Sequence, residues 1–274
     1  MAASESIARD APGTSQIAES IPTVDILGVA VSAIDVNSAV DRLEAAATDK
    51  QAGYVTVTGV HGIMEAQDDR TFRAILNNAL LVTPDGMPTV WIGWLNGYKD
   101  MNRVYGPELM LETCRRSVKS GHTHFIYGGN DGVAEHLAET LRARLPGVRI
   151  LGTYTPPFRE LNATELRDLG EQLERLRPDY FWVCLSTPKQ ERFMARHSGR
   201  LATTVMIGVG AACDILTGRV KDSPNCIKRA GLQWLHRLLQ EPNRLWKRYL
   251  VNNPRFVGKL MRQVWVRRLG RISR

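Results

Sequence analysis

The stretch DYFWVCLSTPKQERF, residues 179–193, joins a predicted buried strand to a predicted helix. The run DYFWVCL is apolar and aromatic almost throughout, which is typical of a strand that is covered on both faces. A short polar turn follows, and Pro188 is suited to the first turn of a helix, where its missing N–H breaks no hydrogen bond. This strand–turn–helix unit indicates a parallel sheet whose strands are connected by helices.

The same alternation runs through most of the chain. Apolar runs predict further strands near 26–31, 54–58, 79–83, 124–129, 148–154 and 204–210, with helical patterns between most of them. The expected fold is therefore α/β: a Rossmann-like parallel sheet covered by helices on both faces. Ligands bind beyond the carboxyl ends of such strands, where Asp85, Gly128-Gly129 and Ser186 are predicted to converge.

Length and composition suggest three regions in these 274 residues, of which 43% are hydrophobic. Residues 1–22 are rich in Ala, Ser and Thr and are predicted to be a disordered N-terminal segment rather than a secretion signal. Residues 23–218 form the predicted Rossmann-like body, and residues 219–274 a basic helical appendage. No apolar run approaches the roughly 20 residues that span a bilayer, which favours a cytoplasmic location.

Positive charge is concentrated in the predicted appendage. Residues 219–274 hold 15 basic and 2 acidic side chains, whereas residues 1–218 hold 21 and 26. This asymmetry favours an anionic partner such as phosphate, nucleic acid or a lipid surface. The appendage also has an apolar stripe at helical spacing, typical of a helix that lies in a membrane interface, although packing of the stripe onto the body is an equal alternative. The stripe consists of Phe256, Val257, Leu260, Met261, Val264 and Trp265.

Neither the cysteines nor the histidines have a metal-binding spacing. Cys184 and Cys213 lie in apolar runs and are predicted to be buried thiols, so we expect no disulfide framework and no metal site.

Polar residues at the predicted strand ends are candidates for a functional site. Asp85 is followed by Gly86, so it is either a turn residue or a catalytic base at the mouth of the sheet. The other strand ends carry backbone N–H groups and side chains that suit a phosphate or a sugar, although each also fits an ordinary strand-to-helix turn. These candidates are Gly128, Gly129, Asn130, Ser186, Lys189 and Gln190. Arg103 offers a planar fork for phosphate, and His61 an acid, a base or a hydrogen-bond donor.

Five motifs, taken in order, resemble the WecG/TagA/CpsF glycosyltransferase family. They are VTPDGMPTVW, NRVYGPELML, STPKQERF, GVGAACDILTGRVKDSP and GLQWLHRLLQEPNRLWKRYL, between residue 81 and about residue 250. The resemblance implies an inverting bacterial enzyme at the inner face of the cell membrane that needs no metal cofactor. Its implied donor is a UDP-sugar, with N-acetylmannosamine or a related sugar. Its implied acceptor is a sugar on undecaprenyl diphosphate, used for teichoic acid or other surface polysaccharides.

The resemblance also implies residue roles. Asp85 corresponds to the family's base, and Arg103 and Gln190 to its polar pocket residues. Arg237 and Arg244, with Lys247 or Arg248, correspond to appendage residues that would meet the acceptor diphosphate or the membrane. The family's threonine and asparagine after the second strand align with Val57 and Gly59, so Thr56, Thr58 or His61 is expected to supply the missing polar group.

Two alternatives follow from the pattern alone. A dinucleotide-binding oxidoreductase would suit the strand–helix alternation, but no glycine fingerprint is present. A nucleic-acid-binding module would suit the basic appendage, in which Trp is interleaved with Lys and Arg. We expect the transferase rather than either alternative, with no nucleic-acid partner, and self-association into a homo-oligomer is a further possibility.

Overall fold

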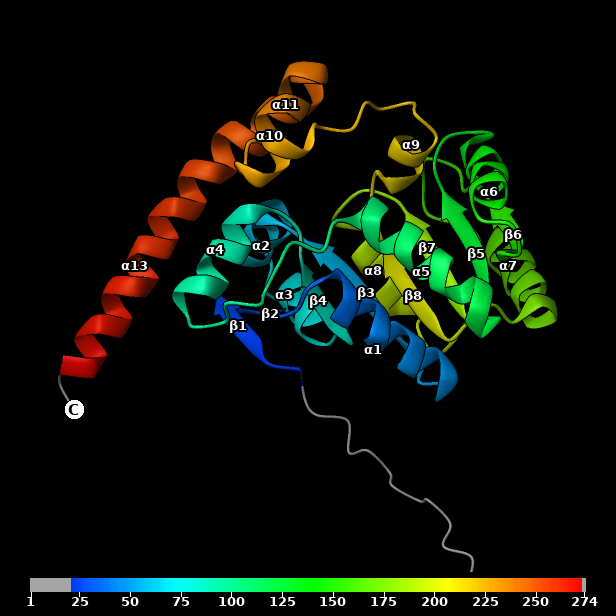
Figure 1. Cartoon of the computed structure of the whole chain (residues 1–274), viewed down its shortest axis with the longest axis horizontal. Coiled ribbons are helices and arrows are strands. Elements are labelled where there is room, and N and C mark those ends of the chain that lie inside the picture. Colours follow the sequence, from blue (N-terminus) through cyan, green and yellow to red (C-terminus); the bar gives the residue numbers. More distant parts are fainter. Residues whose placement is uncertain (1–20, 273–274) are drawn as a thin grey trace, which may run out of the picture.

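The computed structural model describes residues 21–272, apart from the side chains of residues 244 and 267–272. The predicted disordered segment 1–22 therefore lies almost wholly outside the described residues. Elements run in the order strand, helix, strand for most of the chain (Figure 1).

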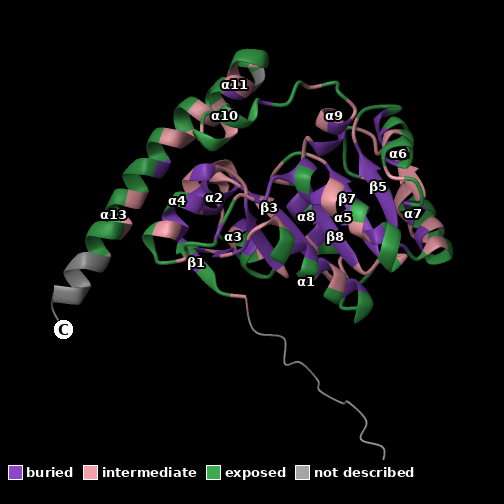
Figure 2. Cartoon of the chain, viewed as in Figure 1, coloured by how far each residue is buried: buried purple, intermediate pink, exposed green. Residues whose placement is uncertain are grey.

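A six-stranded parallel sheet forms the centre of the molecule, in the order β4-β3-β8-β7-β5-β6. Its strands are β3 (Gly53–Thr58), β4 (Leu81–Pro84), β5 (Thr123–Gly128), β6 (Arg149–Tyr154), β7 (Tyr180–Cys184) and β8 (Val205–Gly208). Every residue of β5, β7 and β8 is buried, as Figure 2 shows. The predicted α/β fold is confirmed.

Helices cover both faces of the sheet. One face packs against α1 (Val36–Thr48), α5 (Gly106–Ser120), α6 (Val133–Arg144) and the short α9 (Ala212–Leu216). The other face packs against α7 (Ala163–Leu176) and α8 (Lys189–His197). The helices of both layers pack on the faces of the sheet. The carboxyl ends of its strands are bordered by the turns that follow them, which leave room for a ligand.

The strand predicted at 26–31 is instead the turn and second arm of a hairpin. β1 (Thr23–Ile26) pairs antiparallel with β2 (Val29–Ser32). Leu27 and Gly28 form the two-residue turn, with φ of 53° and 83°, and positive φ at both central positions matches the twist of paired strands. The hairpin packs its apolar residues against α2 (Val60–Asp68), α3 (Arg70–Asn77) and α4 (Met87–Leu95).

The C-terminal segment forms a series of helices along one side of the molecule (Figure 1). They are α10 (Asn225–Arg229), α11 (Gln233–Gln240), α12 (Pro242–Trp246), a π-helical turn η1 (Lys247–Val251) and α13 (Asn252–Ile272). Pro242, which would end a helix at the residue before it, separates α11 from α12. Pro254 does not end a helix in this way, because it lies in the first turn of α13, where proline is tolerated.

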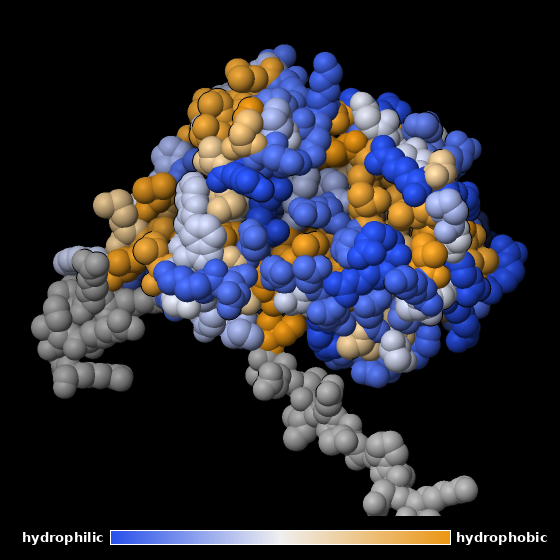
Figure 3. Space-filling model, viewed as in Figure 1, coloured by the Kyte–Doolittle hydropathy of each residue, from blue (hydrophilic) through white to orange (hydrophobic). Residues whose placement is uncertain are grey.

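The apolar stripe of α13 divides between two environments. Phe256 is buried and Leu260 packs beside it in the cluster that also holds the hairpin and α2. An ion pair between Arg255 and Asp68, at 2.7 Å, fixes the same contact. The rest of the stripe faces outward, in Val257, Met261, Val264 and Trp265, which are 45–68% exposed. Part of the stripe therefore packs onto the body, and the rest is exposed and available for a membrane interface. Figure 3 shows apolar surface over α11 and α13.

Cys184 and Cys213 form a disulfide, so the prediction of two free buried thiols is wrong. The two residues are 29 positions apart in sequence, but β7 ends beside the start of α9, and their Cα atoms lie 6.1 Å apart.

Candidate functional site

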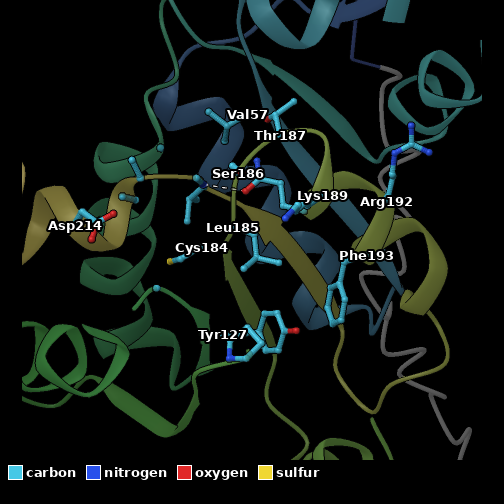
Figure 4. A pocket seen from close by; sticks show the side chains of 18 of the residues that line it. Val57, Tyr127, Cys184, Leu185, Ser186, Thr187, Lys189, Arg192, Phe193 and Asp214 are labelled. Carbon is cyan, nitrogen blue, oxygen red and sulfur yellow. Dashed lines mark hydrogen bonds between the residues drawn. The ribbon is translucent and has the colours of Figure 1, made fainter. Parts of the chain in front are cut away.

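A cavity of about 920 Å³ extends along the carboxyl ends of the sheet strands. Each turn that follows a strand contributes to its wall. In strand order across the sheet, these residues are Asp85 after β4, His61 after β3, Gly210 after β8, Ser186 after β7, Gly129 after β5 and Pro156 after β6. The central part is drawn in Figure 4. The predicted convergence on one pocket is therefore confirmed for Asp85, Gly129 and Ser186.

Asp85 lies at the β4 end of this cavity. Its backbone N–H donates to the carbonyl oxygen of Thr58, at 3.1 Å, which ties the turn to β3. Burial raises the pKa of its carboxyl group above the ordinary value, and three guanidinium groups oppose that shift, those of Arg103, Arg248 and Arg237. An enclosed carboxyl beside positive charges is a suitable proton acceptor.

The C-terminal helices complete the cavity at the same end. Arg237 of α11, Leu245 of α12, Lys247 and Arg248 of η1, and Asn252 of α13 line it. The Arg237 guanidinium also lies 3.4 Å from the carboxylate of Glu241. The side chain of Arg244 is outside the described part of the structure. Two of the guanidinium groups that act on Asp85 thus come from residues about 150 positions away in sequence.

His61 is a neutral member of the site. Burial and the charge of Arg248 lower its pKa to about 4. Its Nδ1 lies 3.2 Å from the side-chain amide nitrogen of Asn252 and 3.7 Å from a carboxylate oxygen of Glu65. With Nδ1 accepting from that amide, the neutral ring carries its hydrogen on Nε2. The ring also forms a hydrogen bond with the backbone of Thr187, so His61 is a neutral, internally bonded ring at neutral pH and not a positive charge.

Five of the predicted donor-binding residues line the cavity: Gly129, Asn130, Ser186, Lys189 and Gln190. Gly128 does not line it. A side chain at Gly128 would meet the carbonyl oxygen of Cys184 at 2.7 Å, so this glycine permits two strands to approach. Lys189 is the first residue of α8. Its backbone N–H and that of Gln190 already donate to the carbonyl oxygen of Ser186, at 2.8 and 3.2 Å, so Lys189 offers an anion its ammonium group and the positive end of the helix dipole.

Gln190 borders the cavity, but its amide is already bonded at both ends. Its oxygen accepts from the N–H of Gly210, at 3.0 Å, and its nitrogen donates to Glu191, at 3.0 Å. Glu191 is itself buried, accepts a hydrogen bond from Thr187, and has a pKa that burial raises. Gln190 therefore holds the turn after β8, whereas we predicted that it would offer donors to a ligand.

Besides Gly128, three predicted residues lie outside the cavity wall. Arg103 donates to the side-chain oxygen of Gln233, at 2.7 Å, and affects Asp85 only by its charge. Thr56 and Thr58 are buried and bond to each other, with 3.0 Å between their hydroxyl oxygens. Side chains alternate along a strand, so the face that carries these threonines is opposite to the one that presents Val57 to the cavity. The expected replacement hydroxyl is therefore absent from the described wall.

Several cavity residues escaped the sequence analysis. Tyr127 and Phe193 stack with 4.7 Å between ring centroids and form an aromatic wall toward β6, and Phe158 lies at the same end. Asp214 lines the opposite wall in Figure 4, and Tyr105 lies near Asp85. Tyr127 directly precedes the glycine pair, and Asp214 lies inside a motif that we quoted, so position relative to a motif was the available signal.

Two further properties bear on the chemistry. Within the described residues, no group of three or more His, Cys, Asp or Glu side chains is arranged to hold a metal ion. None of the helices that the structure describes combines the length and hydropathy that crossing a bilayer requires.

Comparison with known proteins identifies the relatives of this chain. A sequence model described as "Glycosyl transferase WecG/TagA/CpsF family" matches residues 24–270. An N-acetylglucosaminyldiphosphoundecaprenol N-acetyl-beta-D-mannosaminyltransferase of Bacillus spizizenii is 27% identical over 229 residues, which cover 83% of this chain and 86% of that protein. The protein of the same name from Bacillus subtilis is 28% identical over 217 residues, which cover 79% and 82%.

Proposed function

Because the chain belongs to the WecG/TagA/CpsF family of glycosyltransferases, we propose that it transfers N-acetylmannosamine, or a closely related sugar, from UDP to a sugar on undecaprenyl diphosphate. The names of the two Bacillus relatives supply this donor sugar and this type of acceptor. The single observation that carries the proposal is the position of Asp85, at one end of a long cavity and facing arginines from the C-terminal helices.

Asp85 acts as the general base in the proposed reaction. An acceptor hydroxyl is a weak nucleophile at neutral pH, so it needs a proton acceptor as it attacks the anomeric carbon. A well-placed base typically accelerates such a step by about 10²–10⁴-fold. Burial raises the pKa of Asp85 and so makes it a stronger base, while the neighbouring arginines favour the ionised form that can accept the proton.

The shape of the cavity suggests how the donor lies. Four strand intervals separate β4 from β5, and at 4.7–4.9 Å each they span about 19 Å, a distance that suits an extended nucleoside diphosphate sugar. Attack with inversion requires the acceptor and the leaving group on opposite sides of the anomeric carbon. If Asp85 marks the acceptor side, UDP extends away from it along the sheet toward β5 and β6.

Departing UDP gathers negative charge, which the centre of the cavity can stabilise. Along the proposed path, Lys189 supplies a cation, Ser186 supplies a hydroxyl donor, and the N-terminus of α8 adds the positive end of its dipole. Donors fixed before the reaction are effective because they need no reorganisation as charge develops. The same groups would do this work without a metal ion.

The acceptor diphosphate is proposed to bind where the C-terminal helices meet the body. Arg237, Lys247 and Arg248 line this end of the cavity, and guanidinium groups form charge-assisted hydrogen bonds with phosphate. The exposed apolar residues of α13 lie on the same series of helices, together with Lys259 and Arg262. We therefore place the enzyme on an anionic membrane surface, at the cytoplasmic face where UDP-sugars are available.

The test uses the full chain with a panel of UDP-sugars and a short-chain prenyl diphosphate N-acetylglucosamine. Products are weighed by mass spectrometry, and their linkage is read by NMR. We expect a β-linked disaccharide from one N-acetylated donor. Asp85→Asn should lower turnover by at least about 10²-fold while calorimetry still detects UDP binding, and Asp100→Asn, at an exposed site, serves as the matched control. Near-normal turnover of Asp85→Asn eliminates this residue as the base, and an inactive wild-type chain with every donor rejects the substrate assignment.

A further inference from the structure

Tyr105 joins the body of the protein to its C-terminal helices. It is the residue that precedes α5, and its hydroxyl donates to a carboxylate oxygen of Asp222, at 3.0 Å. Asp222 lies in the connection between α9 and α10. The same oxygen also accepts from the backbone N–H of Ser223, at 2.8 Å. One hydrogen bond to this carboxylate therefore comes from the body and the other from the connection itself.

Two cations lie close to the Tyr105 ring. The guanidinium carbon of Arg103 lies 4.5 Å from the ring centroid, and the ammonium nitrogen of Lys228 lies 5.0 Å from it. Lys228 also forms an ion pair with Asp222. Tyr105 is only 7% exposed, so these contacts lie in a partly desolvated place, where cation–π and charged hydrogen bonds are stronger than in water. We call Arg103, Tyr105, Asp222, Lys228 and Gln233 the junction cluster.

The junction cluster fixes the rotation of α11. Arg103 donates to the side-chain oxygen of Gln233, at 2.7 Å. Gln233 is the first residue of α11, and Arg237 follows it by four positions, so both lie on one face of the helix. A second contact, 2.9 Å between the Ser223 hydroxyl and His236 Nδ1, holds the adjacent part of α11. A helix anchored in this way presents Arg237 to the cavity, next to Asp85.

We propose that Tyr105 and Arg103 are positioning residues, which hold α11 in the one register that brings Arg237 to the cavity end occupied by Asp85. Neither residue needs to touch substrate for this role. The catalytic consequence rests on the proposed function, whereas the structural consequence, an ordered α11, does not. The sequence motif suggested that Arg103 binds phosphate in the pocket. In this proposal it instead connects the body to the C-terminal helices.

The experiment compares Tyr105→Phe, Asp222→Asn and the double variant with the wild-type chain. Tyr105→Phe removes one hydroxyl and keeps the ring beside its two cations. Tyr180→Phe is the matched control, because Tyr180 begins β7 at the end of the sheet opposite the cavity. Hydrogen–deuterium exchange of peptides from 225–240 measures the order of α11 without any substrate. Steady-state kinetics with the UDP-sugar and the prenyl diphosphate acceptor measure kcat and KM separately.

We expect exchange in 225–240 to become several-fold faster in both single variants. Asp222→Asn also loses the ion pair with Lys228, so it should have the larger effect. The double variant should exchange no faster than Asp222→Asn alone, because both substitutions act on the same contact between Tyr105 and Asp222. A displacement of about 1 Å at a reacting site lowers rates by about 10²-fold, so kcat should fall about 10- to 100-fold, while KM for the UDP-sugar changes little. The Tyr180→Phe control should match the wild-type chain in both measurements.

Unchanged exchange in both single variants overturns the proposal, whatever the activity. Faster exchange with unchanged kcat overturns the positioning role, because α11 would then be loosened without consequence for the reaction. If even the wild-type chain transfers no sugar, the proposed function fails, and the exchange measurement alone decides whether the junction cluster orders α11.

Discussion

Protonation of His61 should contribute measurably to the pH dependence of the protein's stability. Its pKa is about 4 in the folded protein, against an ordinary value of 6.5 that the unfolded chain should show. The unfolded state therefore binds a proton first as the pH falls. The stabilisation is complete above pH 6.5 and is lost progressively toward pH 4.

The size of the effect follows from the shift in pKa. Each unit is worth 1.36 kcal/mol, so the shift corresponds to about 3 kcal/mol when the pH falls below 4 and to about 2 kcal/mol at pH 5. The imidazole is only 16% exposed, so little solvent screening reduces this figure. The loss is a substantial part of the 5–15 kcal/mol by which a typical protein is stable.

The assay is urea unfolding of wild type and His61→Gln at pH 7.5 and pH 5, followed by tryptophan fluorescence. Glutamine retains polar atoms but does not titrate, so the variant should lose about 2 kcal/mol less than wild type between the two pH values. His124 is also buried, with a pKa lowered to about 3, but it is present in both proteins and cancels. His136→Gln, at an exposed position on α6, should follow the wild-type curve. Parallel losses in wild type and His61→Gln would show that a buried neutral imidazole is not the cause.

Two more outcomes are expected. In Gly59→Ala, the new Cβ would lie 2.6 Å from the carbonyl oxygen of Asp85, so the turn that holds Asp85 must move. We expect about 1–3 kcal/mol of destabilisation and a fall in kcat of about 10²-fold. Unfolding curves and initial rates measure these effects, and a fully active variant would contradict the prediction. A double variant, Met261→Glu with Trp265→Glu, places two carboxylates on the exposed apolar face of α13. It should co-sediment less with vesicles that contain anionic lipid, and it should turn over a detergent-soluble acceptor at the wild-type rate. Undiminished co-sedimentation would show that this face of α13 does not contact the membrane.

The sheet was predictable because its signals are local. A continuous apolar run followed by a helix start, as in 179–193, needs no tertiary information, and most strands were found in this way. The hairpin was missed because Leu27 and Gly28 lie inside an apolar run, and the glycine that permits the turn looks there like part of a strand. The Cys184–Cys213 bond was missed because it depends on which strand end meets α9.

The site was predictable only in part, for two physical reasons. Residues that directly follow strands, such as Asp85 and Ser186, could be assigned to the cavity from their position alone. The local sequence does not determine which face of a strand meets the cavity. The structure presents Val57 there, where we expected the hydroxyl of a neighbouring threonine. Arg103 was equally ambiguous, because its partner Gln233 is 130 residues away in sequence.

The position of β8 determines when the protein can fold during its synthesis. β8 is the last strand of the described chain, yet it lies between β3 and β7 and pairs with both. Until residues 205–208 leave the ribosome, β3 and β4 have no pairing that connects them to β5, β6 and β7, so the nascent chain holds two separate half-sheets with exposed edges. The apolar outer face of α13 is synthesised only after this gap can close. The order of translation therefore separates the two hazards in time, because the exposed apolar residues of α13 are made after the unpaired strand edges can be covered.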